Sequence, residues 1–229
     1  MMTQNNNRLT SDFFAGLKAG IPIWLSMFAF GIVAGILGVK LGLSPLDSAS
    51  MSVIMYTGSG QVAAIQLFHD ASPPLIILLT VLVVNLRFAM YSASLAPHFE
   101  PLNKRQKLIA GYLLSDQAYI VSLLRYQRGE VGSKYRFYLG AALSLWAIWQ
   151  LGTLVGAFTG AQMPASWGME LAAPLTFLAL MFSALRDKPG VAAAAVSGIV
   201  AVSAAALPWH LNMLVGALAG VITGMVLSR

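Results

Sequence analysis

Two charged residues stand inside long apolar segments of this sequence, and they are the residues best suited to chemistry. Arg87 lies within the run Pro74–Ala96, and Asp116 lies at the middle of the run Leu108–Leu124. A charged side chain at the centre of a bilayer costs about 2.5–3.5 kcal/mol on insertion scales, so such residues pair or serve a function. Both are therefore candidates for a site at membrane depth.

Each of the two residues has a role that suits its chemistry. A guanidinium binds a carboxylate through two parallel hydrogen bonds, and helical spacing places Arg87 and Tyr91 on one face, with Asn85 well around the helix. A buried carboxyl beside a cation can be tuned to take up and release protons, which makes Asp116 the candidate proton carrier. The alternatives are a pair that is neutralised only for packing, or an arginine that snorkels to an interface.

A third candidate is a polar segment near the middle of the apolar run Ser48–Phe68. Its sequence is Tyr56-Thr57-Gly58-Ser59-Gly60-Gln61. Two glycines weaken a helix, while serine, threonine and glutamine supply hydrogen-bonding groups. Transporters often build sites at the membrane midplane from discontinuous helices. We therefore predict an unwound helix that exposes backbone groups to a substrate; the alternative is tight packing of helices through small residues.

The composition predicts the elements that must hold these residues. The chain has 229 residues, of which 58% are hydrophobic and 10% charged, whereas soluble domains carry about 25% charge. Segments that span lipid are helices or closed barrels, because unpaired backbone groups are costly there. The apolar runs are long and do not alternate, which favours helices. The sequence predicts an all-α, polytopic integral membrane protein.

About eight apolar runs are long enough to be transmembrane helices, since about 20 residues cross the hydrocarbon core. They are Ala19–Val39, Ser48–Phe68, Pro74–Ala96, Leu108–Leu124, the first part of Phe137–Met169, Trp167–Leu185, and two within Pro189–Ser228 that are separated at Pro208–Asn212. Leu108–Leu124 is short and Val191–Leu207 is only mildly hydrophobic, so seven helices is the alternative. We predict a single transmembrane domain over residues 1–229.

Loop charges predict the orientation, because lysine and arginine are in excess in cytoplasmic loops. With eight helices, most of these residues fall on the side of the N-terminus. Both termini are therefore predicted to be cytoplasmic, in a bacterial inner membrane. The cluster Lys104-Arg105-Lys107 falls on the opposite side and is the exception to this pattern.

A glycine pattern indicates two internal repeats. Gly31-x3-Gly35 in the first run matches Gly152-x3-Gly156 in the fifth, and tryptophan precedes both. Transporters are often built from duplicated halves, so residues 16–126 and 137–229 are candidate repeats. The alternative is that both glycine pairs are general helix-packing motifs.

Four segments resemble the large subunit of the AzlC-type branched-chain amino acid exporters. They are Gly16–Pro22 (GLKAGIP), Met55–Gln61 (MYTGSGQ), Asn85–Phe99 (NLRFAMYSASLAPHF) and Leu113–Tyr119 (LLSDQAY). The resemblance implies a secondary transporter, coupled to the proton gradient as an antiporter, that exports valine, leucine and isoleucine, with methionine as a further candidate. It also implies a small AzlD-type membrane subunit as partner. The family often has an acidic pair where this chain has Asp116-Gln117, so any coupling by the second carboxylate is lost here.

Two other functions stay open on the sequence alone. A passive channel or a non-transporting scaffold subunit would be indifferent to Asp116. An intramembrane serine protease would use Gly58-Ser59-Gly60 as its nucleophile motif and His210 as its base, although Thr57 stands where that motif begins with glycine.

The sequence also predicts no enzyme chemistry, no cofactor, no metal and no nucleic acid partner. Cysteine is absent from the chain, which excludes disulfides and thiolate metal sites. The three histidines are scattered along the sequence, and no basic domain is present to bind nucleic acid.

Overall fold

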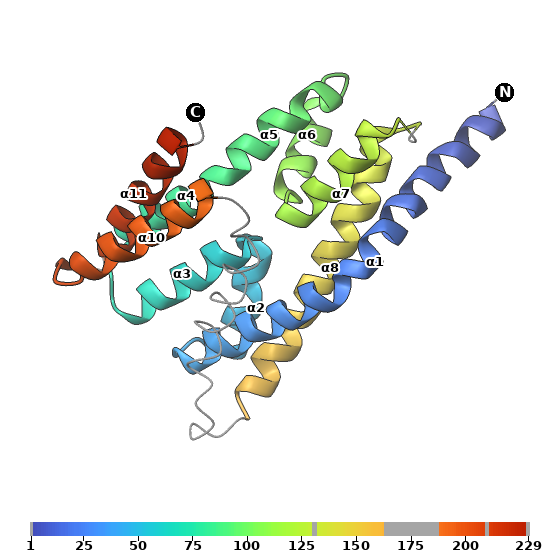
Figure 1. Cartoon of the computed structure of the whole chain (residues 1–229). Coiled ribbons are helices and arrows are strands. Elements are labelled where there is room, and N and C mark those ends of the chain that lie inside the picture. Colours follow the sequence, from blue (N-terminus) through green and yellow to red (C-terminus); the bar gives the residue numbers. More distant parts are fainter. Residues whose placement is uncertain (1, 130–131, 163–187, 209–210, 228–229) are drawn as a thin grey trace.

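The regular structure of this chain is helical wherever the computed structural model describes it, in residues 2–129, 132–162, 188–208 and 211–227 (Figure 1). The all-α prediction is therefore confirmed for these ranges. The helices are α1 (Met2–Lys40), α2 (Pro45–Ile54), α3 (Gly58–His69), α4 (Pro74–Val84), α5 (Leu86–Phe99), α6 (Lys104–Tyr112), α7 (Asp116–Gln127), α8 (Lys134–Gly160), α10 (Lys188–Ser203) and α11 (Leu211–Leu227).

Among the described residues, two helices are long and apolar enough to cross a membrane by themselves: α8 and the Ser11–Lys40 part of α1. The pair α4 and α5 makes a third crossing if its two helices, bent by 42° at Asn85, count as one. The predicted helix Trp167–Leu185 lies outside the described residues. The total of seven or eight transmembrane helices stays a prediction.

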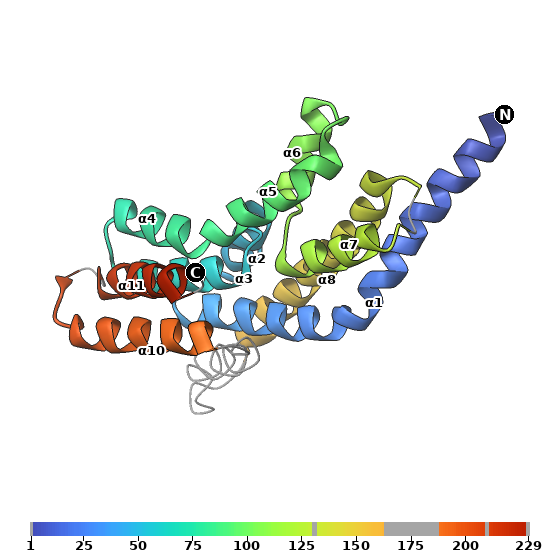
Figure 2. The ribbon, with the colours of Figure 1, turned by 45° about the horizontal axis from the view of Figure 1, so that its top comes forward.

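The centre of the bundle is the pair α1 and α8, which lie side by side in Figures 1 and 2. The predicted glycine pairs face each other across it: a Cβ on Gly35 would collide with the Thr153 carbonyl oxygen, and one on Gly156 with that of Ile32. Small residues let helix backbones approach closely in membranes, so the packing interpretation of these glycines accounts for them. The halves 16–126 and 137–229 stay a prediction.

The two central helices run parallel. Gly16, in the first half of α1, lies against Phe137 near the start of α8, while Gly160 at the end of α8 lies against Ile36 near the end of α1. The bundle therefore has two ends. We call them the Lys134 end, where α8 begins, and the Lys40 end, where α1 finishes.

The run Ser48–Phe68 is broken into α2 and α3, and together they form hairpin 1. The helix ends before Met55, and Thr57 is extended, so the chain is unwound at the first residues of the predicted segment. The rest of that prediction is wrong, because Gly58–Gln61 form the first turn of α3. Hairpin 1 does not cross the bundle as predicted. It begins at the Lys40 end, where Ser48 Oγ donates to the Gly35 carbonyl, and it returns there, with His69 Nδ1 3.0 Å from the Leu41 carbonyl oxygen.

The run Leu108–Leu124 is broken in the same way into α6 and α7, which form hairpin 2. Its α6 follows α5, whose His98 lies 2.9 Å from Lys134 Nζ, and its α7 returns so that the Tyr126 hydroxyl donates to the Lys134 carbonyl at 2.7 Å. Both ends of hairpin 2 therefore lie at the Lys134 end. The prediction of one helix with Asp116 at its middle is wrong, because Asp116 is the first residue of α7.

The tips of the two hairpins meet beside the middle of α8, where Trp146 Nε1 donates to the Tyr112 hydroxyl at 3.1 Å. The Tyr112 hydroxyl donates to the Val53 carbonyl at 2.6 Å, and the rings of Tyr56 and Tyr112 lie 6.5 Å apart. The bent pair α4–α5 passes beside both tips and carries the chain between the two ends of the bundle (Figure 1). The antiparallel pair α10 and α11 packs next to α4, apart from hairpin 2 (Figure 2).

Candidate functional site

A cavity of about 400 Å³ lies where the two hairpin tips meet the bend after α4 and the middle of α1 and α8. This volume is within the range of pockets that bind small molecules. The lining residues are Ser26, Met27, Phe30, Tyr56, Thr57, Gly58, Ser59, Arg87, Phe88, Ser115, Asp116, Gln117 and Trp149. A guanidinium, a carboxylate and several hydroxyl groups therefore face the same space as four aromatic side chains.

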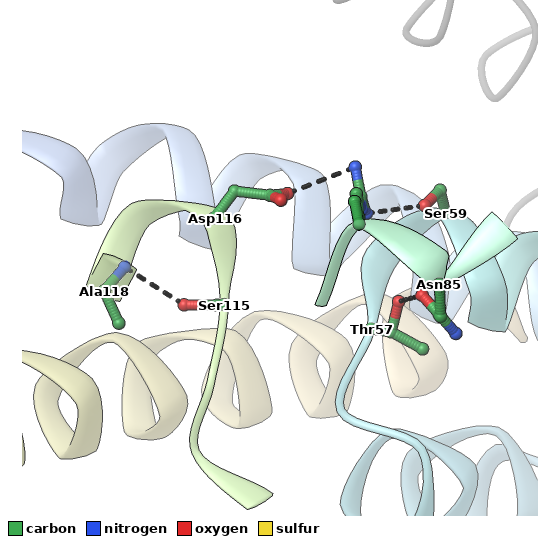
Figure 3. A network of polar contacts seen from close by, with 7 residues as sticks. Thr57, Ser59, Asn85, Ser115, Asp116 and Ala118 are labelled. Atoms are coloured by element: carbon green, nitrogen blue, oxygen red, sulfur yellow. Dashed lines mark hydrogen bonds and ion pairs between the residues drawn. The ribbon is translucent and has the colours of Figure 1, made fainter. Parts of the chain in front are cut away.

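The two charged residues predicted as candidates form an ion pair in this cavity. Arg87 Nη1 lies 3.3 Å from Asp116 Oδ2, and Arg87 Nη2 donates to Ser59 Oγ at 2.8 Å (Figure 3). Ser59 belongs to hairpin 1 and Asp116 to hairpin 2, so Arg87 bridges the tips. The pair that the sequence left undecided is thus present, and it lies on the cavity wall rather than in a packed core.

The ion pair leaves hydrogen-bonding capacity unused. Arg87 Nε and Asp116 Oδ1 are buried and have no hydrogen bond of acceptable geometry to the described residues. The side chains of Arg87 and Asp116 keep exposed fractions of 33% and 36%. A guanidinium offers five donors and a carboxylate about four acceptor positions, so both groups can accept a ligand beside or in place of each other.

The tip of hairpin 1 presents an uncapped helix N-terminus to the cavity. Thr57 holds the N-cap position of α3 but makes no capping bond, because its hydroxyl donates to Asn85 Oδ1 at 2.7 Å (Figure 3). The first amides of a helix have no partner within it and favour negative charge. Gly58 and Ser59, the first two residues of α3, line the cavity. Gly60 has to be small, since a Cβ there would lie 2.7 Å from Asn85 Nδ2.

The tip of hairpin 2 is built differently. Ser115 caps α7 by accepting a hydrogen bond from the Ala118 amide at 3.3 Å (Figure 3). Asp116 follows as the first helical residue, where the partial positive charge of the helix end stabilises its carboxylate. Sequence patterns could have located this start, because a serine followed by an acidic residue is typical of a helix N-terminus.

Four of the predicted site residues do not line the cavity but lie next to it. Asn85 holds Thr57, and Gly60 packs against Asn85. Tyr91 stacks on Tyr119 with 4.4 Å between ring centroids. Gln61 is fully buried, and neither of its amide atoms has a hydrogen bond to the described residues.

The sequence prediction missed several lining residues. Ser115 directly precedes a helix, and its residue type and position fit the pattern of a helix N-cap, which the sequence alone could have shown. The aromatic wall had no such signal, because Phe30 comes from α1 and Trp149 from α8, and their rings meet edge to face at 5.5 Å. His210, the proposed base of a protease, lies outside the described residues.

Comparisons with known proteins place these residues in a family. The family model described as AzlC protein matches residues 22–163, a range that contains every lining residue. Over 225 residues the chain is 26% identical to the inner membrane protein YgaZ of Escherichia coli, covering 95% of this chain and 91% of that protein. It is 27% identical over 218 residues to an uncharacterized membrane protein of Archaeoglobus fulgidus, covering 94% of each.

A further relative is an uncharacterized membrane protein of Helicobacter pylori, which is 26% identical over 174 residues, 74% of this chain and 75% of that protein. No solved structure matches the chain at a significant level. All three relatives are named as membrane proteins, which agrees with the long apolar helices α1 and α8.

Proposed function

The chain belongs to the AzlC family of multi-pass membrane proteins, and from this we propose that it exports branched-chain amino acids: valine, leucine and isoleucine, with methionine as a further candidate. One observation carries the proposal. An ion pair with unused hydrogen-bonding atoms bridges two broken helices at a cavity that also has an aromatic wall. Transporters bind their substrates at such interruptions of transmembrane helices.

The cavity offers a complement to each part of an apolar amino acid. Arg87 and the first amides of α3 suit the carboxylate, since both favour negative charge. Asp116 suits the ammonium group. Phe30, Phe88 and Trp149 provide apolar surface for the side chain. When a zwitterion binds, the Arg87–Asp116 ion pair is replaced by two ion pairs, Arg87 with the ligand carboxylate and Asp116 with the ligand ammonium group. No charge is then left unpaired at membrane depth.

Coupling to protons is proposed to run through Asp116. It is the one carboxylate among the described lining residues, and Gln117 beside it cannot titrate. A proton on Asp116 and an ammonium group beside it exclude each other, because a protonated carboxyl no longer attracts the cation. Proton entry would therefore release the amino acid, as an antiporter requires.

We also propose that export needs a small AzlD-type membrane subunit, which follows from membership of the family. Co-expression of a candidate subunit is the direct check. Leucine export that is equal with and without the subunit contradicts this part of the proposal.

The test of the proposed function is efflux of labelled leucine from vesicles that hold the protein together with the candidate subunit. We expect efflux that rises with an imposed pH gradient and that falls to the level of empty vesicles in Asp116→Asn. Glu100→Gln is the matched control, since Glu100 is exposed and does not line the cavity. Gradient-independent flux that Asp116→Asn leaves unchanged would instead favour a passive channel, and no flux from folded protein would favour a scaffold.

A further inference from the structure

Each hairpin enters the bundle and leaves it at the same end, and the two hairpins use opposite ends. Hairpin 1 is tied to the Lys40 end through the contact of His69 with Leu41. Hairpin 2 is tied to the Lys134 end through the contact of Tyr126 with Lys134. The bent pair α4–α5 runs from the first end to the second, in the direction opposite to α1 (Figure 1).

The segments 11–69 and 74–127 have the same order of elements. The first segment begins with the long helix α1, and the second begins with the bent pair α4–α5. A short linker follows, Leu41–Ser44 or Glu100–Asn103, and its last residue caps the next helix with its side chain. A short helix follows, then a break at Met55–Thr57 or Leu113–Ser115. Each segment closes with a helix of 12 residues.

We infer that residues 11–69 and 74–127 are two structural repeats with inverted orientation in the membrane, and that each hairpin enters the bilayer from a different face to reach the shared cavity. This inference goes beyond the proposed function and is independent of which solute is carried. It divides the chain differently from the halves 16–126 and 137–229.

The lengths of the hairpin helices agree with entry to the midplane. At 1.5 Å per residue, α2 and α3 are roughly 15 and 18 Å long, about half of a hydrocarbon core of about 30 Å. Non-helical backbone at membrane depth is tolerated only where protein or a water-filled cavity surrounds it. Both breaks meet this condition, because each contributes residues to the cavity or to the buried core.

The distribution of basic residues agrees with the inverted hairpins. If hairpin 2 were a simple crossing, Lys104, Arg105 and Lys107 would lie on the face opposite Arg125, against the positive-inside rule. The hairpin brings all of them to the Lys134 end. Among the described residues up to 136, every lysine and arginine then lies at the Lys134 end, except Lys40 at the opposite end and Arg87 in the cavity. By the positive-inside rule, the Lys134 end is cytoplasmic.

In the inverted arrangement, each hairpin separates the cavity from one face of the membrane. Hairpin 2 lies between the cavity and the cytoplasm, and hairpin 1 lies between the cavity and the outer face. Arg87 holds both tips, through Asp116 and Ser59. Movement of one hairpin away from Arg87 opens one route while the other hairpin stays bound, which is the requirement for access from one side at a time.

The absence of cysteine from the chain allows a direct test by labelling of single-cysteine variants in the natural sequence. The four variants are Leu46→Cys and Ala71→Cys at the two ends of hairpin 1, and Pro101→Cys and Gln127→Cys at the two ends of hairpin 2. All four residues are exposed. Intact cells are treated with a membrane-impermeant maleimide before and after permeabilisation, and denatured samples show that each thiol is present.

We expect Leu46→Cys and Ala71→Cys to react in intact cells, and Pro101→Cys and Gln127→Cys to react only after permeabilisation. Simple crossings would place the two ends of each hairpin on opposite faces, so one variant of each pair would react and the other would not. That result would overturn the inference. Labelling needs no substrate, so its outcome is separate from that of the efflux test.

Discussion

The two hairpin tips have nearly the same construction and opposite chemistry. Each break ends in a hydroxyl residue, Thr57 or Ser115, directly before a 12-residue helix. In hairpin 1 the next residue is Gly58, and the hydroxyl is turned to Asn85, so the helix end keeps its free amides beside Arg87. In hairpin 2 the hydroxyl caps the helix and the next residue is Asp116.

This comparison shows that local geometry and local charge are set by different residues. The break and the cap position make a helix N-terminus in both tips, which favours negative charge. Asp116 supplies that charge from the protein at one tip. At the tip of hairpin 1 the protein supplies no negative charge, so a ligand carboxylate can bind there. The cavity therefore has an anion-binding side at hairpin 1 and a cation-binding side at hairpin 2.

The largest expected effect is the loss of the anion-binding side in Arg87→Gln. A hydrogen bond to a charged group contributes about 1.5–3 kcal/mol, so we expect leucine efflux to fall by about tenfold to more than a hundredfold. The analogue 4-methylpentanoate, which keeps the carboxylate and lacks the ammonium group, should inhibit efflux by the wild type. It should still bind Asp116→Asn and should not bind Arg87→Gln.

The control for this change is Arg128→Gln, which removes an exposed arginine at the end of α7. We expect it to transport as the wild type does. Binding of 4-methylpentanoate to Arg87→Gln with unchanged affinity would show that the carboxylate is not held at the tip of hairpin 1.

A smaller effect is expected from Gly58→Ala, which alters the tip of hairpin 1 by one methyl group. Its Cβ would lie 2.6 Å from Phe30 Cε1, so the ring has to move from the cavity wall. We expect leucine efflux to fall by about tenfold, in keeping with a cost of 1–3 kcal/mol for overpacking. Gly111→Ala in hairpin 2 is the matched control, because a Cβ there meets nothing within 4 Å. Equal transport by both variants would contradict the close packing of Phe30 on this tip.

The smallest effect distinguishes the two hydroxyl residues. Ser115→Ala removes a helix cap, so we expect it to lower the free energy of unfolding by about 1 kcal/mol. Thr57→Val removes a hydrogen bond but no cap, and we expect a loss of about 0.5–1.5 kcal/mol together with weaker leucine binding, because Asn85 is released beside Gly60. Thermal unfolding in detergent and binding of labelled leucine measure the two quantities. If leucine binding were reduced in Ser115→Ala and unchanged in Thr57→Val, the hydroxyl that supports leucine binding would be that of hairpin 2 and not that of hairpin 1.

Part of the candidate site was predictable from residue type and position. A lone arginine and a lone aspartate in apolar runs are expensive in lipid, and Arg87 and Asp116 indeed form the polar centre of the cavity. The polar segment from Tyr56 to Gln61 also predicted a break. The aromatic wall was not predictable, since Phe30 and Trp149 resemble any other aromatic residue in a transmembrane helix until α1 and α8 are packed together.

The helical, membrane-embedded character of the protein follows from composition and from the length of its apolar runs. In lipid the backbone N–H and C=O groups must be hydrogen-bonded within the protein, which a helix achieves. Whether an apolar run crosses the membrane or turns back within it does not follow from composition or length. A hydropathy window records the cost of transferring about 20 residues into lipid, and that cost is the same for one crossing helix and for two half-length helices that turn back. The direction of Ser48–Phe68 depends on long-range contacts such as that of His69 with Leu41, and these exist only once the chain is folded.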